Sequence, residues 1–451
     1  MPDGPGVELS GWGRTASSVA RPLDGVTELT AWLRAPDGRG VIARGLGRSY
    51  GDAAQNAGGH VLGPLPTEID LSDLRGPDPP QVRVSAGTGL EELIRALLPT
   101  GHFVPVTPGT RQVTVGGAVA ADVHGKNHHR DGSIGVHVAS LDLLLADGSR
   151  EHLTPEGDPD LFWATLGGMG LTGVITSVVL RVPRVETGWM RVRTERIGSL
   201  GRLMERMREA DHGWTHSVAW IDTLARGSAR GRSVLTLGEH ARLEELPERL
   251  AAQRWALPRT ARLGVPGLVP PGVMSRASTR AFNEVWFRKA PVLREVGWES
   301  GSSYFHPLDS VRGWNRLYGP RGFVQYQLVI PDEAEGELPG LLQRIAEAGH
   351  PSFLSVLKRF GPGTPGPLSF PMPGWTLAMD LPTAPGLRDL FADLDDVVAG
   401  CGGRLYLAKD SRMSAAMLRR TYPRLDEFLA VRDRVDPGRV FSSDLSRRLE
   451  L

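Results

Sequence analysis

The stretch Arg44-Gly45-Leu46-Gly47-Arg48-Ser49-Tyr50-Gly51 is the most informative part of this sequence. It follows the apolar pair Val41-Ile42, which predicts a glycine-rich turn leaving a short strand over 41–43. Glycines let backbone N–H groups approach a ligand closely, and two arginines add positive charge, so the segment suits a pyrophosphate. The glycine spacing is not that of the Rossmann fingerprint, and no helical apolar period follows. Taken alone, the pattern also fits an ordinary tight loop.

Composition excludes several classes of protein. The chain has 451 residues, long enough for two or three domains, with 52 basic and 51 acidic residues and a net charge of +1. This balance gives no global signature of nucleic-acid binding. No apolar run is long enough for a membrane helix, and residues 1–21 lack the pattern of a Sec signal peptide. The single cysteine, Cys401, excludes an internal disulfide and a cysteine-based metal or iron–sulfur site.

Hydrophobic periodicity predicts alternating strands and helices in the first part of the chain and a different texture after Pro183. A helix over 90–98 carries its leucines on one face, and Gly101 closes it. Further expected strands are 81–85, 138–146, 173–182, 322–330 and 404–408; further expected helices are 197–210 and 414–421, followed by a charged tail. We therefore expect an N-terminal domain over 1–187, a middle domain over 188–403 and a C-terminal return over 404–451.

Two further segments carry groups suited to a binding site. Thr107 to Thr110, followed by Val113 to Ala118, is a small-residue segment that we interpret as a turn offering hydroxyl donors, or as a packed loop. The run His124-Gly125-Lys126-Asn127-His128-His129 brings three histidines together. We expect no metal site there, because adjacent histidines point to different faces and no carboxylate stands at ligand spacing. Of the three histidines, His124 is the better candidate for a binding-site side chain, because Gly125 beside it makes the backbone flexible there.

These runs, together with Gly167-Gly168-Met169-Gly170-Leu171-Thr172-Gly173-Val174-Ile175, resemble the vanillyl-alcohol-oxidase type of FAD enzyme. Longer runs are similar to the decaprenylphosphoryl-β-D-ribose 2′-oxidase family: His124 to Ser133, Phe162 to Thr165, Tyr318 to Pro320, Leu368 to Pro371 and Ala408 to Arg412. The resemblance extends from Gly11 to Leu451. It implies an α+β, two-domain vanillyl-alcohol-oxidase-type FAD-binding fold with a sheet-based substrate domain.

The same resemblance implies FAD as a non-covalent cofactor and assigns the residues around it. The implied FAD-binding residues are Ala43, Arg44, Gly45, Leu46, Gly47, Arg48, Ser49, Tyr50, Gly51, Asp52, Ala53, Gly109, Thr114, Val115, Gly116, Gly117, Ala121, Asp122, Val123, His124, Ile175 and Tyr406. The implied substrate-binding residues are Lys409, Tyr406, Lys358, Gln325, Gln327, Arg316 and Trp220.

The implied reaction oxidises the 2′-hydroxyl of decaprenylphosphoryl-β-D-ribose to a 2′-keto sugar, a step toward the arabinose donor of the cell wall. A group must take the hydroxyl proton while the C2′ hydride goes to the flavin. Lys409 is the first candidate and His124 the second, and a lysine can act as a base only if its pKa is lowered. The structural alternative for Lys409 is a surface partner of Asp410. Lys358 and Arg316 are candidate clamps for the lipid-linked phosphate, or solvated cations.

The implied partners are a short-chain keto-reductase, a quinone as electron acceptor and, by peripheral contact, a membrane on its periplasmic side. The proline- and glycine-rich apolar segment from Leu263 to Met274, flanked by Arg259, Arg262 and Arg276, is our candidate for that contact. The chain departs from the family at Ala378, Phe305 and Thr376, where cysteine, tyrosine and asparagine are expected, so substrate preference stays open. The alternatives are an alditol or aldonolactone oxidase acting on a soluble sugar, and a non-catalytic flavin-binding scaffold.

Overall fold

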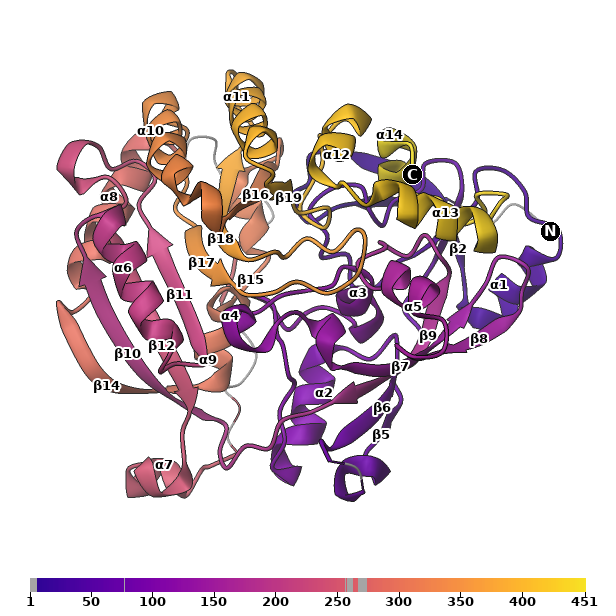
Figure 1. Ribbon diagram of the computed structural model, residues 1–451, viewed down its shortest axis with the longest axis horizontal. Helices are drawn as coiled ribbons and strands as arrows, with labels where there is room; N and C mark the ends of the chain where they lie inside the picture. Colours follow the sequence, from indigo (N-terminus) through magenta and orange to yellow (C-terminus); the bar gives the residue numbers. More distant parts are fainter. Residues whose placement is uncertain (1–5, 77, 256, 258–262, 267–273) are drawn as a thin grey trace.

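A computed structural model describes residues 6–76, 78–255, 257, 263–266 and 274–451. Two smaller sheets built from the first part of the chain lie beside one large sheet built mostly from the middle part (Figure 1). The expected apolar segment from Leu263 to Met274 lies largely outside the described residues, as do Arg259 and Arg262. Within the described ranges, no helix is long and apolar enough to cross a membrane.

A four-stranded sheet holds the glycine-rich loop. Its order is β1 (Val7–Ser10), β2 (Ser17–Leu23), β4 (His60–Leu62) and β3 (Val41–Ala43). The helix α1 (Gly25–Leu33) buries Leu29 and Leu33 against this sheet. The C-terminal part of the chain joins it, because the backbone N–H of Val41 donates to the carbonyl of Val440 at 2.8 Å. The glycine-rich loop therefore follows a strand that is fixed on both sides, by the sheet and by the C-terminal part of the chain.

A five-stranded sheet forms the other layer of this half of the molecule. Its order is β5 (Ile69–Asp70), β6 (Gln81–Ser85), β9 (Val174–Arg181), β7 (Val138–Leu144) and β8 (Arg150–Leu153). The accompanying helices are α2 (Leu90–Leu97), α3 (Val115–Ala120), α4 (His128–Asp131) and α5 (Pro159–Thr165). The helix predicted over 90–98 is confirmed, with all its leucines buried. The predicted turn at 115–118 is wrong: this segment starts α3, because the Thr114 hydroxyl accepts from the backbone N–H of Gly117 and caps it.

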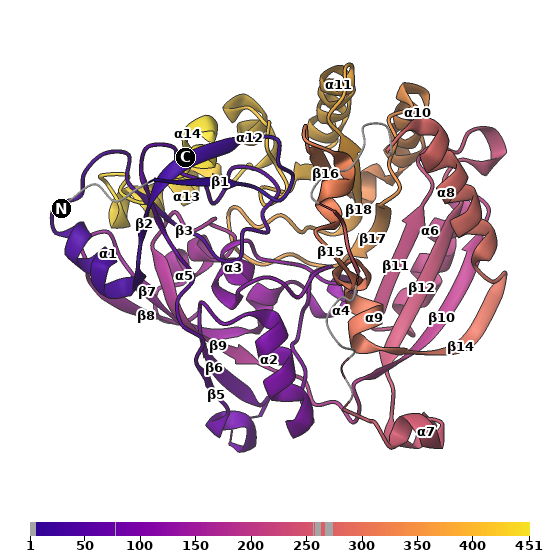
Figure 2. The same cartoon turned by 180° about the vertical axis from the view of Figure 1, so that it is seen from behind.

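The large sheet has eight antiparallel strands. Their order is β14 (Leu293–Ser300), β10 (Trp189–Ile197), β12 (Ser233–His240), β11 (His216–Ile221), β17 (Ser355–Phe360), β18 (Gly374–Pro382), β16 (Phe323–Pro331) and β19 (Arg404–Leu405). The helices α6 (Leu200–Asp211), α10 (Leu338–Ala348) and α11 (Leu387–Gly400) cover one face, whereas α8 (Arg276–Lys289) crosses the opposite one (Figures 1 and 2). The remaining short elements are α7 (Glu248–Ala251), α9 (Gly301–Phe305), β13 (Leu263–Gly264) and β15 (Val311–Arg312).

The end of the chain is more ordered than its charge suggests. The expected charged tail is wrong, since α12 (Ala415–Thr421) is followed by α13 (Leu425–Val435) and α14 (Asp444–Leu449). Leu425 and Phe428 on α13 are buried, so an apolar face outweighs the charges. The strand expected over 404–408 ends at Leu405, because the backbone turns at Tyr406, whose carbonyl accepts from Lys409 N–H at 3.0 Å. The domain boundaries at 187 and 403 stay predictions.

Candidate active site

The glycine-rich loop lines a large polar cavity. Its volume is about 520 Å³, and four arginines line it: Arg14, Arg44, Arg48 and Arg316. The other lining residues are Ser10, Gly11, Trp12, Leu46, Gly47, Gly313 and Asn315. Arg44 is held by the carbonyls of Ser10 and Ala54, both at 2.8 Å. The Arg48 guanidinium lies 4.0 Å from the centre of the Trp12 ring. Such a donor set suits an anion with several oxygens, such as a diphosphate.

The glycines of this loop are required partly by the protein itself. A Cβ at Gly51 would lie 2.0 Å from the backbone carbonyl oxygen of Asp410. Gly47 has a φ of +64°, which side chains other than glycine adopt at a cost. By contrast, a Cβ at Gly109 would meet nothing within 4 Å. The loop is therefore pressed against the returning C-terminal segment, whereas Gly109 stands beside open space.

The returning segment carries Lys409 to the loop. The backbone N–H of Tyr50 donates to the carbonyl of Ala408 at 2.9 Å, and Lys409 Nζ lies 4.0 Å from the centre of the Tyr50 ring. The alternative in which Lys409 pairs with Asp410 at the surface is wrong. The Asp410 carboxylate is buried and accepts instead from Arg448 at 2.8 Å.

The large sheet presents a row of polar side chains on one face. In its register, Gln325 and Gln327 of β16 stand opposite Asp380 and Ala378 of β18, and Lys358 of β17 stands opposite Thr376. Because side chains alternate along a strand, positions two residues apart share a face. This face therefore holds two amides, a carboxylate and an amine drawn from three strands that are far apart in sequence.

His124 lies at the end of this row. Lys358 Nζ is 3.1 Å from His124 Nδ1, and Gln327 Nε2 is 2.9 Å from His124 Nε2. The Phe360 ring packs 4.7 Å from the imidazole. Burial, reinforced by the Lys358 cation, lowers the pKa of His124 well below its usual value. His124 is therefore neutral at physiological pH, with both ring nitrogens engaged.

Burial also lowers the pKa of the two site lysines. The pKa of Lys358 falls to about 7, chiefly through burial and then through the neighbouring Lys409 cation. Burial lowers the pKa of Lys409 to about 8, while the Asp380 carboxylate acts in the opposite direction. Both amines thus titrate close to neutral pH, as a proton-accepting lysine requires.

Asp380 is the functional candidate that sequence reasoning missed. It is fully buried, it accepts a hydrogen bond from Gln325, and burial raises its pKa to about 7. The nearby Tyr318 hydroxyl and the Lys409 cation partly offset this rise in pKa. The available signal was a lone carboxylate inside the apolar strand Trp375-Thr376-Leu377-Ala378-Met379-Asp380-Leu381.

Tyr406 and Asp122, two other expected FAD-binding residues, both contact the protein itself. Tyr406 lies at the His124 cluster: its hydroxyl donates to the carbonyl of Ala121 at 2.8 Å, and its ring stacks on Phe370 at 4.7 Å. The Asp122 carboxylate accepts hydrogen bonds from the protein itself: from the Gly135 N–H at 3.0 Å and from the hydroxyls of Thr364 and Ser369.

Arg316 lies outside the His124 cluster, whereas Trp220 of β11 stands opposite Val356 of β17 and so lies on the same sheet face as Lys358. Arg316 lies in the wall of the arginine-lined cavity. Trp220 Nε1 donates to the carbonyl of Phe353 at 2.9 Å.

The three departures from the family have different surroundings. Thr376 accepts from Gln327 at 3.2 Å and donates to the carbonyl of Leu328 at 2.8 Å, so its hydroxyl remains part of the row. Ala378 lies on the same face between Gln327 and Val356. Phe305 is buried in an aromatic cluster and stacks on Phe103 at 5.5 Å.

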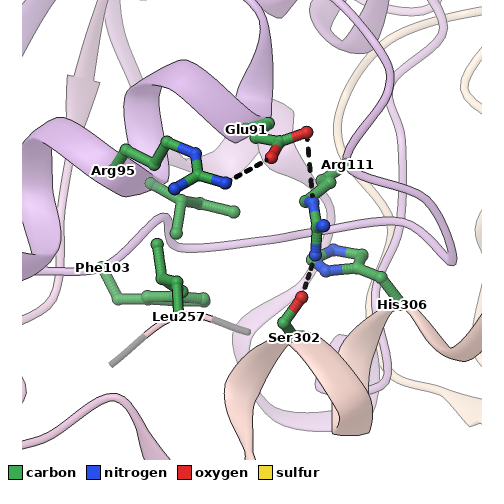
Figure 3. Close-up of a pocket in the computed structure, with 8 residues that line it drawn as sticks. Glu91, Arg95, Phe103, Arg111, Leu257, Ser302 and His306 are labelled. Carbon is green, nitrogen blue, oxygen red and sulfur yellow. Dashed lines mark hydrogen bonds and ion pairs between the residues drawn. The ribbon is translucent and has the colours of Figure 1, made fainter. Parts of the chain in front are cut away.

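A second, much smaller cavity of about 10 Å³ lies where α2 meets α9 (Figure 3). Glu91 binds Arg95 at 2.8 Å and Arg111 at 3.3 Å, and Arg111 also donates to Ser302. This volume holds no more than about one water molecule. The cluster joins the two halves of the molecule and is too small for a ligand.

Comparison with known proteins gives the family. A model of the FAD binding domain matches residues 24–154, and a model of D-arabinono-1,4-lactone oxidase matches residues 377–449. A decaprenylphosphoryl-β-D-ribose oxidase from Mycolicibacterium smegmatis is 44% identical over 451 residues, which cover 98% of this chain and 97% of that protein. The chain belongs to this oxidase family. An alditol oxidase from a Streptomyces species is more distant, at 25% identity over 96% of each chain.

Membership confirms the predicted family, the mixed α+β fold with an FAD-binding domain, and FAD as the cofactor. The matched FAD-binding region contains the glycine-rich loop and His124. The arginine-lined cavity fits the diphosphate of this cofactor in charge, and the open space at Gly109 leaves room for close backbone approach.

Proposed function

We propose that this chain oxidises the 2′-hydroxyl of a polyprenylphosphoryl-β-D-ribose to the 2′-keto sugar, with FAD bound between the glycine-rich loop and the polar face of the large sheet. The observation that carries this proposal is that two lysines lie in the site: Lys358 contacts the His124 imidazole, and Lys409 lies over the Tyr50 ring. Bound FAD would supply the acceptor for the C2′ hydride. The chain's own residues must then bind the sugar, orient its hydroxyl and accept one proton.

Lys409 is the proposed proton acceptor. Its pKa of about 8 leaves a substantial neutral fraction in mildly alkaline solution, and its position over the Tyr50 ring fixes the amine. Asp380 and Gln325 form the buried polar pair behind it. We propose that Asp380 is a positioning residue that sets the charge state of Lys409.

His124 and Lys358 are proposed to orient the sugar. When Lys358 is charged, it donates to His124 Nδ1, and the imidazole then carries its hydrogen on Nε2, so the Gln327 amide must turn its oxygen toward Nε2 to accept it. The Lys358 ammonium retains further donors for a sugar or phosphate oxygen. Arg316 is the proposed contact for the lipid-linked phosphate, and the other arginines of its cavity are left for the diphosphate of FAD.

The partners of this reaction are also proposals. A short-chain keto-reductase would reduce the 2′-keto product, and a membrane quinone would reoxidise the flavin. Peripheral contact with the periplasmic face of the membrane would give access to a lipid-linked substrate. The finding that no described helix could cross a bilayer is compatible with such contact.

The deciding experiment is anaerobic mixing of the flavin-loaded protein with farnesylphosphoryl- or decaprenylphosphoryl-ribose, followed by flavin absorbance. We expect bleaching by these substrates and none by free alditols or aldonolactones. Lys409→Ala should abolish rapid bleaching while retaining bound flavin. Arg150→Ala, an exposed cation on strand β8, is the control for loss of a positive charge. Fast, oxygen-dependent turnover of a soluble alditol would instead favour the alditol oxidase alternative.

A further inference from the structure

Helix α8 has its apolar side turned to solvent. Its buried side chains are Thr279 and Asn283, whereas Phe282, Val285 and Trp286 are 42%, 65% and 44% exposed. Helices that pack on a sheet normally bury the apolar side. A contiguous exposed apolar face of this kind marks an interaction surface.

A polar network holds α8 in this orientation. Asn283 Nδ2 donates to Asp222 at 2.7 Å, and Arg232 bridges Asp222 at 2.7 Å and Glu284 at 2.6 Å. Because these contacts lie on the inner side of α8, the aromatic residues remain outside. The exposed face is thus built into the fold.

The rim of this face is basic. Helix α8 carries four exposed cations: Arg276, Arg280, Arg288 and Lys289. Its single acidic residue, Glu284, is paired with Arg232 and Arg288. Exposed apolar residues surrounded by cations are typical of helices that lie in the interface of an anionic bilayer.

An aromatic row leads from this face toward the active site. The Trp286 and Phe282 rings stack at 5.9 Å, Phe282 meets Phe353 at 5.8 Å, and Phe353 stacks on Tyr318 at 5.8 Å. The buried Tyr318 lies near Asp380, which raises the pKa of its hydroxyl after the larger effect of burial. Phe353 also accepts the Trp220 hydrogen bond through its carbonyl. The row therefore joins the exposed face to the Asp380 side of the site.

We infer that the α8 face docks on an anionic lipid bilayer, and that the row Trp286–Phe282–Phe353–Tyr318 guides the isoprenoid chain of the substrate from that bilayer to Lys409. The second half of this inference rests on the proposed function. The occupant is a lipid surface rather than a second copy of the chain, because a basic rim repels its own copy and attracts anionic headgroups.

Vesicle flotation of the flavin-loaded protein tests the docking face without substrate. We expect binding to vesicles of phosphatidylcholine with phosphatidylglycerol, and weaker binding to phosphatidylcholine alone. The double variant Phe282→Ser/Trp286→Ser should weaken binding by about tenfold. The matched control is Val19→Ser, because Val19 is 55% exposed on the distant strand β2 and should bind as the wild type does.

Three results would overturn the docking face: equal binding of the double variant and the Val19 control, no preference for anionic vesicles, or a dimer in sedimentation velocity that the double variant converts to monomer. Flavin content and melting temperature check that each variant folds. Vesicle binding without flavin bleaching by farnesylphosphoryl-ribose would refute the proposed function and leave the docking face standing.

The aromatic row has its own test. Phe353→Ala should raise the KM for the decaprenyl substrate several-fold more than the KM for a short prenyl analogue, because only the long chain follows the row. An equal change for both substrates would overturn the guiding role.

Discussion

Replacing Asp380 by asparagine isolates the electrostatic control of Lys409. The substitution keeps the shape of the side chain and an oxygen for the Gln325 hydrogen bond, but it removes the negative charge. In the native protein, burial lowers the pKa of Lys409 to about 8 and Asp380 opposes this effect. Without the carboxylate, burial acts alone and the pKa of Lys409 must fall further.

The expected size follows from general electrostatics. A neighbouring opposite charge shifts a pKa by about 1–3 units, and one unit corresponds to about 1.36 kcal/mol. We use a shift of about 1 unit, the lower end of this range, because the pKa of Asp380 is itself raised to about 7. Its carboxylate is therefore fully charged only above that pH. We therefore expect the pKa of Lys409 to move from about 8 to about 7.

The sign of the effect on activity is fixed. A base must be neutral to accept a proton, so the rate rises with pH through the pKa of Lys409. In Asp380→Asn this rise should move about one unit toward acid. The maximum rate should fall, because a less basic amine accepts the proton with less driving force.

The assay is the pH dependence of the first-order rate of anaerobic flavin bleaching at saturating substrate. Asp395→Asn is the matched control, since Asp395 is a partly buried carboxylate that accepts from Tyr326 at 2.8 Å on the opposite face of β16. A midpoint that stays in place in Asp380→Asn, or that moves equally in Asp395→Asn, would refute the assigned roles of Lys409 and Asp380.

Three further outcomes are expected. Gly51→Ala should lower the melting temperature and flavin retention, at a cost of about 1–3 kcal/mol in unfolding free energy, because its Cβ would lie 2.0 Å from the Asp410 carbonyl. Gly201→Ala, on α6 and beside open space, is the control, and equal destabilisation contradicts the reasoning. Lys358→Met should raise the pKa of His124, measured by NMR of the imidazole, because a neighbouring cation is removed; an unchanged value contradicts the contact. Arg448→Met should loosen the C-terminal helix and speed flavin loss, since Arg448 binds two carboxylates; hydrogen exchange of α14 measures this, and unchanged protection contradicts it.

Sequence patterns predicted most of the regular elements near the site. The strand before the glycine-rich loop, the helix with its leucine face and the central strand with Gln325 and Gln327 all show local periodicity. The errors came where local signals compete. Val115 to Ala118 contains two glycines and suggests a turn, but the Thr114 cap and burial against the sheet make it a helix.

The glycine-rich loop, the His124 run and the Lys409 segment determined, from the sequence alone, that this chain belongs to a flavin-dependent ribose oxidase family. Tertiary structure alone decided how these residues cooperate. Lys358 reaches His124 across 234 positions, and Asp380 faces Gln325 through strand register. Neither contact leaves a local pattern, because burial and pKa depend on which strands become neighbours and which faces they share. The same reason explains α8, whose aromatic residues lie outside because the hydrogen bond between Asn283 and Asp222 fixes which side of the helix faces the protein.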